Sequence, residues 1–260
     1  MQRMGIGVQL YTLRDEMEKD VPGTLRKVAE LGFEGVEFAG YFNIPAEQMR
    51  ALLDENGLKA FSTHVDYTRL NNDLQGEIAY AKAIGAQYIP CSYIKPEDRQ
   101  HPEDWRGIID FLHTVAEEVS KQGLQFCYHN HEFEFETKLD GVSVYDKLFG
   151  TIGGNLMKSE LDVCWVQYAK EDPLALIRQY AGRLPLLHTK DFKRGDDNGM
   201  ITLQLGQGEV DLPAVLEEAG RAGVEWLVVE QDYCQNPPFA SVEASLNWLK
   251  EHYLTKVGVS

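Results

Sequence analysis

Histidines and carboxylates recur at the ends of short apolar segments along this chain. Asp162 follows the run MKSEL, His188 follows LPLL and Glu230 follows WLVV, so each is expected to project from the end of a strand. Buried carboxylates of like charge repel one another and are costly to desolvate unless a cation lies among them. Asp162, His188 and Glu230 are therefore predicted to bind a divalent metal ion.

Polar residues end most of the other apolar segments as well. A single polar residue at a strand end means little, because every strand must leave the core for a loop. Exposure to solvent does not readily explain why histidines and carboxylates occur at most of the strand ends. Together these residues indicate one shared site. We predict that five of these polar residues contact the substrate: Gln9, Tyr11, Glu37, His64 and His129.

The residue types also limit the metal. About four ligands drawn from oxygen and imidazole, with no thiolate, suit one Mn²⁺ ion, with Mg²⁺, Co²⁺ and Zn²⁺ as alternatives. The cysteines show neither a CxxC motif nor Cys/His zinc spacing, and most of them lie in apolar runs. They are expected to be reduced thiols without disulfides: Cys91, Cys127, Cys164 and Cys234.

Elements that alternate along the whole chain must position these residues. Short β-rich segments are followed by longer amphipathic segments, with a repeat of roughly 30 residues that is typical of βα units in a parallel sheet. We count eight units. Their strands are expected near residues 6–12, 35–40, 59–65, 87–93, 124–130, 157–163, 184–190 and 226–231.

The amphipathic segments have apolar residues at i, i+3 and i+4, which predicts helices. A helix over residues 241–253 is expected to seal the fold, and residues 193–211 are interpreted as one long loop before a helix over 211–223. Three other helices are predicted to end on glycine, over residues 24–32, 45–57 and 104–123, with Gly32, Gly57 and Gly123 as caps.

Eight βα units favour a closed barrel over an open doubly wound sheet. Neither GxGxxG after the first strand nor GxxxxGK[ST] is present, so the usual phosphate cradle of nucleotide folds is missing. No linker or low-complexity tract interrupts the pattern. The sequence predicts an α/β protein with a (β/α)8 TIM barrel as a single domain over residues 1–260, with its site at the C-terminal mouth.

Composition limits the partners. The 25 Lys and Arg residues against 41 Asp and Glu give a net charge of −16, which repels nucleic acid and anionic membranes. The N-terminus lacks the features of a signal peptide, and no apolar run is long enough to span a bilayer. We expect a cytoplasmic protein with a small-molecule carbohydrate substrate; its oligomeric state is left open, with a homo-oligomer as one option.

The ordered set YHNHEFEF (128–135), ELDVCW (160–165), LHTKDF (187–192), GQGEVD (206–211) and VVEQD (228–232) resembles the xylose isomerase-like barrel superfamily over nearly the whole chain. Its members include sugar phosphate isomerases/epimerases, ketose 3-epimerases and inosose dehydratases. The resemblance implies a Glu-Asp-His-Glu metal site, of which Asp162, His188 and Glu230 carry over directly. For the fourth ligand we favour Glu134, folded back from the loop, over His129 at the strand end.

The main functional hypothesis is a sugar isomerase or epimerase that acts on a keto sugar or polyol. The metal would hold two adjacent oxygens of a hydroxy-ketone and stabilise the enediolate formed when the C–H between them loses its proton. Glu134 and Glu230 are the candidate acid/base pair, with His131 or Lys190 as substitutes. Lys190 is alternatively a fixed cation that stabilises the negative oxygen.

Two alternatives remain open. The same proton abstraction followed by loss of a hydroxyl or glycosidic oxygen gives a dehydratase or lyase acting on an inosose or 3-keto sugar, and a sugar-binding barrel without catalysis is the third reading. The remote endonuclease IV type needs three zinc ions and a basic DNA-facing surface, which this chain lacks. The segment after the eighth strand has no Gly, Lys or Arg, so we expect an unphosphorylated substrate.

Overall fold

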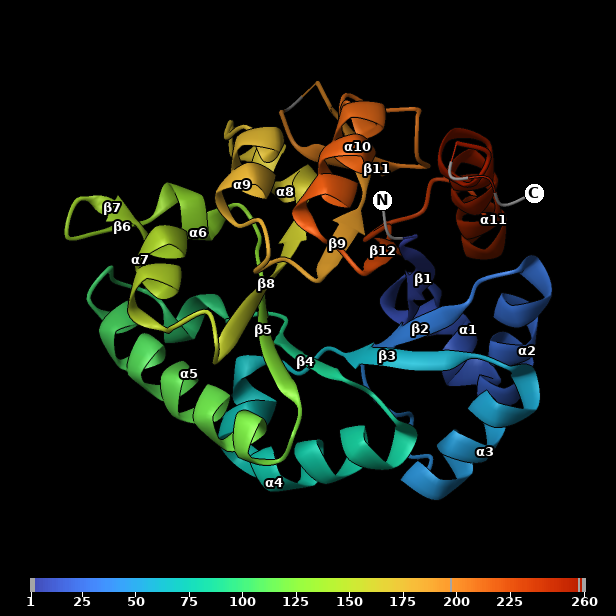
Figure 1. Cartoon of the computed structure of the whole chain (residues 1–260), viewed down its shortest axis with the longest axis horizontal. Coiled ribbons are helices and arrows are strands. Elements are labelled where there is room, and N and C mark those ends of the chain that lie inside the picture. Colours follow the sequence, from blue (N-terminus) through green and yellow to red (C-terminus); the bar gives the residue numbers. More distant parts are fainter. Residues whose placement is uncertain (1–2, 197, 257, 259–260) are drawn as a thin grey trace.

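Eight parallel strands close into a barrel with helices around its outside (Figure 1). The computed structural model describes residues 3–196, 198–256 and 258. Neighbouring strands follow the order β1-β12-β9-β8-β5-β4-β3-β2, and the predicted (β/α)8 TIM barrel is confirmed. The barrel strands are β1 (Gly5–Gln9), β2 (Gly35–Phe38), β3 (Lys59–Thr63), β4 (Tyr88–Cys91), β5 (Gln125–His129), β8 (Met157–Asp162), β9 (Leu186–Thr189) and β12 (Trp226–Val229).

Helices connect successive strands on the outside of the barrel. Two of the predicted glycine caps are present, because Gly32 and Gly57 end their helices with φ angles of 103° and 65°. The long helix after β4 ends one residue earlier than predicted, on Gln122. The helical elements are η1 (Leu10–Leu13), α1 (Arg14–Lys19), α2 (Val21–Leu31), α3 (Ala46–Asn56), α4 (Tyr67–Ile84), η2 (Pro96–Asp98), α5 (Asp104–Lys121), α6 (Phe133–Glu136), α7 (Val144–Thr151), α8 (Val163–Tyr168), α9 (Pro173–Gln179), α10 (Leu212–Ala222), α11 (Pro238–Leu249) and η3 (Lys250–Leu254).

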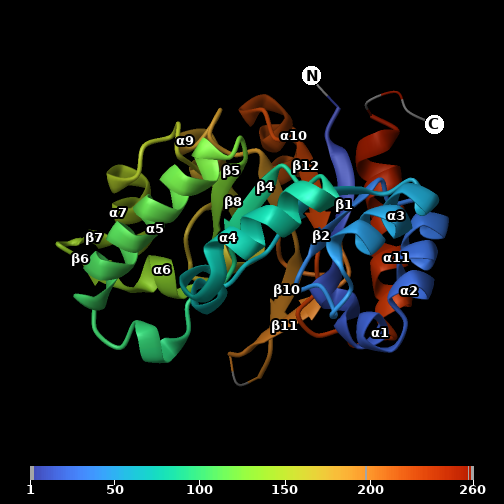
Figure 2. The same ribbon diagram turned by 90° about the horizontal axis from the view of Figure 1, so that it is seen from below.

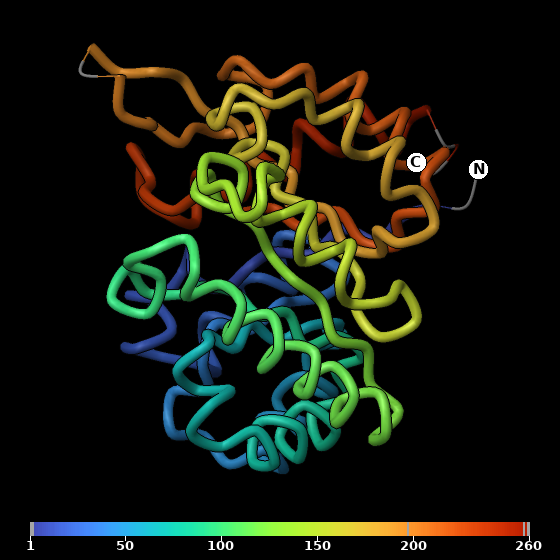
Figure 3. Tube along the Cα trace, turned by 90° about the vertical axis from the view of Figure 1, so that its left-hand side faces the viewer, coloured from blue at the N-terminus to red at the C-terminus, as the bar shows by residue number. Residues whose placement is uncertain are grey.

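Segments near the two ends of the described chain lie side by side (Figure 3). The backbone N–H of Met4 donates a hydrogen bond of 2.6 Å to the hydroxyl of Tyr253. The last helix therefore packs against the first strand, as the prediction of a sealing helix requires. No helix within the described residues is long and apolar enough to cross a bilayer.

Alternation along the strands separates an apolar barrel floor from a polar mouth. Cys127, Leu186 and Val228 belong to one buried apolar cluster although they come from β5, β9 and β12. Side chains two residues apart point to the same face of a strand. The next inward positions on these three strands are polar, which places three functional candidates above the floor: His129, His188 and Glu230.

The segment predicted as one long loop contains a hairpin, which corrects the prediction. Strands β10 (Asp191–Arg194) and β11 (Met200–Leu203) pair antiparallel, with Asp191 opposite Leu203. Figure 2 shows this hairpin projecting from the end of the barrel opposite to the two chain termini. A second short hairpin, β6 (Lys138–Leu139) with β7 (Val142–Ser143), lies between α6 and α7.

Asp191 anchors the hairpin and the loop that follows it. Its buried carboxylate accepts backbone N–H groups from Phe192 at 2.9 Å, Gly206 at 3.0 Å, Gly208 at 2.8 Å and Val210 at 3.1 Å. A Cβ atom on Gly208 would lie 2.2 Å from Asp191 Oδ1, so glycine allows this close approach. The motif GQGEVD thus wraps its backbone around one carboxylate.

We expect Asp191→Ala to lower the free energy of unfolding by about 3 kcal/mol, because four backbone donors lose a charged acceptor. Urea denaturation followed by circular dichroism measures the change. Asp196→Ala, at an exposed position of the same hairpin, is the matched control and should unfold like the parent protein. Equal stabilities of the two variants would contradict the anchoring role of Asp191.

Four cysteines are free in the structure: Cys91, Cys127, Cys164 and Cys234. The first three are buried and Cys234 is half-buried, and burial raises the pKa of each thiol. We expect the denatured protein to take up four alkyl groups whether or not it is first reduced. Intact-mass spectrometry tests this, and a reductant-dependent count would show a disulfide.

Candidate active site

A cavity of about 610 Å³ opens at the carboxyl ends of the barrel strands. Its wall includes His64 after β3, His129 and His131 at the end of β5, and Glu230 and Asp232 after β12. Small-molecule sites commonly have volumes of about 300–1,000 Å³. Side chains from strands far apart in the sequence therefore line one cavity of suitable size for a sugar.

The predicted substrate-binding residues divide into two layers. Tyr11, His64 and His129 line the cavity. Gln9 and Glu37 lie fully buried and do not belong to its wall. Gln9 Nε2 donates to Glu37 Oε1 at 2.9 Å, and Gln9 Oε1 accepts the backbone N–H of Tyr11. Gln9 and Glu37 are thus placed to support the cavity residues.

Four buried residues from the ends of β5, β8, β9 and β12 form what we call the mouth group: His129, Asp162, His188 and Glu230. One potential ligand atom from each lies within 4.8 Å of the others. Asp162 Oδ2 is buried and has no hydrogen-bond partner among the described residues, which fits a metal ligand. This donor set of imidazole and carboxylate is able to hold a metal ion.

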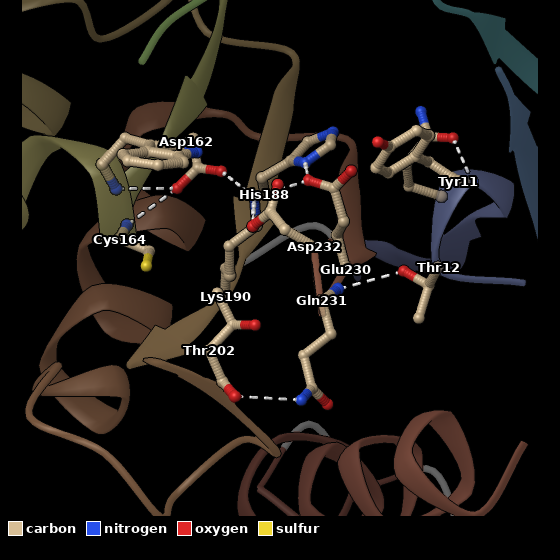
Figure 4. A network of polar contacts seen from close by, with 12 residues as sticks. Tyr11, Thr12, Asp162, Cys164, His188, Lys190, Thr202, Glu230, Gln231 and Asp232 are labelled. Carbon is tan, nitrogen blue, oxygen red and sulfur yellow. Dashed lines mark hydrogen bonds and ion pairs between the residues drawn. The ribbon is translucent and has the colours of Figure 1, made fainter. Parts of the chain in front are cut away.

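Lys190 places an ammonium group among the carboxylates of the mouth (Figure 4). Its Nζ lies 2.9 Å from Asp162 Oδ2, 2.7 Å from Glu230 Oε2 and 2.9 Å from Asp232 Oδ2. These contacts lack the angles of hydrogen bonds. Burial alone would lower the pKa of Lys190, but the three carboxylates raise it well above its usual range. Lys190 is therefore a fixed cation at the mouth.

Asp162 has two roles in the fold. Its Oδ1 accepts the backbone N–H groups of Cys164 at 2.9 Å and Trp165 at 3.0 Å, and so caps the N-terminus of α8. The second oxygen, Oδ2, is left to the mouth, where it faces Lys190. The helix cap therefore fixes the direction of the carboxylate, which is the preorganisation that a ligand needs.

A second group of potential ligands lies deeper in the barrel, and we call it the inner group. It consists of His64, His129, Glu160 and His188, whose ligand atoms also lie within 4.8 Å of one another. Glu37 borders it, with Oε1 at 3.1 Å from His64 Nε2 and 2.8 Å from His188 Nε2. Burial alone would lower the pKa of His64, but Glu37 and Glu160 raise it to about 10.

His131 also lines the cavity. Its ring stacks on Phe133 with centroids 5.5 Å apart and lies 5.2 Å from the ring of Trp165. Burial lowers the pKa of His131 to about 3, and the Lys190 ammonium acts in the same direction. His131 is therefore a neutral imidazole held between aromatic rings.

The family profile of the xylose isomerase-like TIM barrel matches residues 25–252. This chain belongs to that family. An inosose dehydratase of Geobacillus kaustophilus is 24% identical to it, with 90% of this chain and 89% of the relative covered. A sugar phosphate isomerase/epimerase of Parabacteroides distasonis superposes with a TM-score of 0.82 at 22% identity, covering 95% and 98% of the two chains. An L-ribulose 3-epimerase superposes with a TM-score of 0.73 at 15% identity, covering 97% and 95%.

Among these xylose isomerase-like barrels, this chain was expected to use Glu134 as its fourth ligand. Within the described residues, Glu134 lies outside both the mouth group and the inner group. Its oxygens accept Tyr128 Oη at 2.7 Å and the backbone N–H of His131 at 2.8 Å. Burial raises the pKa of Glu134 to about 7, although both hydrogen bonds oppose this shift. The geometry favours His129 as the fourth ligand, and the assignment stays a prediction.

We expect Glu134→Gln to retain its bound metal and His129→Ala to lose it, because only His129 has a ligand atom in the mouth group. Metal analysis after gel filtration measures both contents. Glu136→Gln, two residues further along the same helical turn and exposed, is the matched control. Loss of metal from Glu134→Gln would restore Glu134 as the ligand, whereas retained metal with lost proton exchange would make it an acid or base.

Glu160 was missed at the sequence level. It precedes Asp162 by two residues on β8, so both side chains point into the barrel. In MKSELD, side chains alternate between the two faces of the strand, and this alternation could have predicted that Glu160 shares the inward face with Asp162. Lys95 and Arg99 were also missed. They line the cavity from the segment after β4, whereas the sequence prediction considered a phosphate-binding cation only after the seventh and eighth barrel strands.

Proposed function

We propose that this protein is a metal-dependent lyase that removes water from an inosose or a closely related keto polyol. The observation that carries the proposal is the unequal placement of the two predicted acid/base carboxylates. Glu230 lines the cavity, whereas Glu134 is fully buried outside its wall. An epimerase built on the predicted Glu134–Glu230 pair needs both carboxylates at the substrate carbon, whereas elimination needs one base at that carbon and an acid near the departing hydroxyl, and Glu230 and Asp232 both line the cavity.

Glu230 is suited to accept the proton next to the carbonyl. Burial alone would raise the pKa of Glu230, but Lys190 and His188 lower it, so the carboxylate is ionised. His188 Nδ1 lies 2.9 Å from Glu230 Oε2, and Lys190 Nζ lies 2.7 Å from the same oxygen. These two contacts fix the base in one orientation at the wall of the cavity.

Asp232 is the candidate acid for the departing hydroxyl. It lines the cavity, and burial raises its pKa, although the Lys190 ammonium opposes this shift. Lys190 Nζ lies 2.9 Å from Asp232 Oδ2 and also contacts Glu230, so one ammonium links the base and the acid. When the C–H proton passes to Glu230, a C=C bond forms as the C–O bond of the neighbouring carbon breaks. The hydroxyl leaves with the Asp232 proton as water.

The mouth group fits the divalent ion that the family resemblance implies; Mn²⁺ was the predicted ion, and two imidazoles with two carboxylates move the preference toward Zn²⁺ or Co²⁺. The bound ion would supply Lewis-acid stabilisation of the negative charge that develops on the carbonyl oxygen. His131, a neutral imidazole at the cavity wall, is available to bind a substrate hydroxyl. Tyr11, exposed at 41%, offers a ring face at the rim.

The charges on the cavity wall support an unphosphorylated substrate. Arg69 is held by Glu77, with Nη2 at 2.7 Å from Oε2, so part of the positive charge is already paired. With the imidazole of His64, whose pKa is raised to about 10, the cations on the wall only equal the carboxylates, so the wall offers a phosphate group no net positive charge. The charged wall residues are Asp66, Glu132, Glu230 and Asp232 against Arg69, Lys95 and Arg99.

The test uses the purified protein loaded with Mn²⁺ and a racemic inosose as substrate. Elimination gives a conjugated enone, which is followed by its ultraviolet absorbance and by mass spectrometry. Glu230→Gln should abolish product formation while the enzyme stays folded. Product formation at the parental rate in this variant, or no product with any inosose or 3-keto sugar, would contradict the proposal.

Isomerisation or epimerisation of a keto sugar is the second candidate. His131 and Glu230 both line the cavity, so two proton-transfer groups are available without Glu134. Incubation of ketoses in D₂O separates the outcomes. Deuterium at the carbon next to the carbonyl, with a new stereoisomer and no loss of water, would favour this candidate. Binding without any exchange would indicate a sugar-binding barrel.

A further inference from the structure

We propose that the rim of the cavity holds an aromatic subsite, built on Tyr233 and Tyr11, which binds a planar apolar ring attached to the keto polyol. Tyr233 directly follows Asp232 after β12, and Tyr11 belongs to η1 after β1. The inference rests on the proposed function for the part of the substrate that enters the mouth, and it adds a second part that stays at the rim. The substrate class is therefore a cyclic keto polyol that carries an aromatic substituent.

Exposed hydrophobic side chains are concentrated at this rim. Among the residues that the structure describes, the large hydrophobic side chains that are exposed are Tyr11, Tyr93, Val142 and Tyr233, with Tyr233 the most exposed at 70%. All three tyrosines line the cavity, whereas Val142 lies in the short hairpin of β6 and β7. Single exposed hydrophobic residues are ordinary, but a group of them at the entrance of a pocket is typical of a ligand-binding surface.

The backbone of Tyr233 is held firmly although its ring is exposed. The Thr202 hydroxyl donates to the Tyr233 carbonyl at 2.8 Å and accepts the Tyr233 N–H at 3.2 Å. Gln231 Nε2 donates to the same carbonyl at 3.3 Å and to the Thr202 carbonyl at 3.1 Å. Thr202 and Gln231 are both buried. Buried side chains therefore fix the point from which the exposed ring projects, and such preorganisation lowers the cost of binding.

Arg14 connects the rings of the two tyrosines. Its guanidinium carbon lies 4.3 Å from the ring centroid of Tyr11 and 5.7 Å from that of Tyr233. Arg14 Nη1 also donates to the Tyr11 carbonyl at 2.8 Å. A guanidinium within about 6 Å of a ring centroid is attracted to the face of the ring. The shared cation therefore places Tyr11 and Tyr233 near one another at the rim.

The cavity combines polar groups at the mouth with aromatic rings at the rim. Glu230, Asp232 and His131 line it and supply the polar groups that the proposed elimination uses. The cavity measures about 610 Å³, and pockets of about 300–1,000 Å³ bury ligands of drug size. An inosose is one six-membered ring, so it fills only part of this volume. Because Tyr233 adjoins Asp232 in the chain, the remaining space at the rim suits a planar ring that stacks on tyrosine.

The experiment compares two probes that share a sugar and differ in one substituent, phenyl β-D-glucopyranoside and methyl β-D-glucopyranoside. Neither has a ketone, so neither undergoes elimination, and isothermal titration calorimetry with the metal-loaded full chain measures binding without turnover. Tyr233→Ala removes the ring, whereas Tyr233→Phe keeps the ring without its hydroxyl. Val142→Ala is the matched control, because it shortens an exposed hydrophobic side chain outside the cavity.

We expect the parent protein, Tyr233→Phe and Val142→Ala to bind the phenyl glucoside about tenfold more tightly than the methyl glucoside. Tyr233→Ala should bind the two glucosides equally. The proposal is overturned if the parent protein binds neither probe or binds both equally, or if the preference survives in Tyr233→Ala. A changed oligomeric state of Tyr233→Ala with an unchanged preference also overturns it, because the rim is then a contact between copies of the chain.

Enone formation from an inosose is measured separately from this binding preference. The phenyl preference without enone formation supports the subsite and contradicts the proposed elimination. Enone formation without the phenyl preference supports the elimination and overturns the subsite. The two proposals therefore fail separately.

Discussion

Asp162→Asn is expected to lower the rate of catalysed proton exchange about 1,000-fold, equivalent to about 4 kcal/mol of lost transition-state stabilisation. The buried Oδ2 of Asp162 faces the mouth beside the Lys190 ammonium, so its replacement by an amide nitrogen removes a negatively charged ligand. Asparagine keeps an Oδ1 acceptor for the backbone N–H groups at the start of α8. The variant should therefore fold normally and lose its mouth metal.

The control is a chemically identical change at another helix N-terminus. Asp172 caps α9 by accepting the backbone N–H of Leu174 at 2.9 Å, and it lies outside the cavity. Asp172→Asn should keep parental activity and metal content. Deuterium exchange on the substrate, Mn²⁺ content and thermal unfolding are compared for both variants. A fully active Asp162→Asn variant would remove Asp162 from the mechanism.

The barrel was predictable because its signals are local and repeated. Apolar β-rich runs such as 157–163 and 226–231 became β8 (Met157–Asp162) and β12 (Trp226–Val229). In a parallel barrel all strand ends meet at one mouth, so the position of a residue at a strand end already indicates its neighbourhood. Asp162, His188 and Glu230 follow from that rule, and the structure brings them together.

The features that the sequence left open depend on contacts between distant segments. Glu134 belongs to a single helical turn, and its direction is set by the hydroxyl of Tyr128 on β5. The hairpin in residues 193–211 depends on Asp191, whose carboxylate binds backbone groups up to 19 residues away. Glu160 lies in the mixed segment MKSELD, where only the alternation of the strand shows that its side chain points into the barrel. Its partners His64 and His129 come from other strands.

Buried charge is the property that unites the mouth and inner groups. At the mouth, Asp162, Glu230 and Asp232 share the single ammonium of Lys190. Deeper in the barrel, Glu37 and Glu160 are fully buried and face imidazoles instead. At the mouth the carboxylates outnumber the single ammonium, and this excess favours the uptake of a divalent ion, whereas the deeper carboxylates are paired with imidazoles whose pKa values they raise.

Lys190→Met is expected to lower the free energy of unfolding of the metal-free protein by about 3–5 kcal/mol. Methionine fills a similar volume but leaves three carboxylates at the mouth without their cation. The side chain of Lys190 is fully buried, so water cannot replace the ammonium easily. Urea denaturation in the presence of a chelator measures the loss.

The same variant should bind Mn²⁺ at the mouth about tenfold more tightly or better, because the repulsion by a neighbouring ammonium is gone. Mn²⁺ at about 100 times its dissociation constant should then restore about 2.7 kcal/mol of stability. Lys158→Met is the control, since Lys158 Nζ donates to the carbonyl of Gly182 and, within the described part of the chain, forms no ion pair with a mouth carboxylate. Catalysis should still be lost in Lys190→Met, because Glu230 and Asp232 are no longer linked by a proton-bearing group. Unchanged stability without metal, or weaker Mn²⁺ binding, would show that Lys190 does not hold the charge of the mouth.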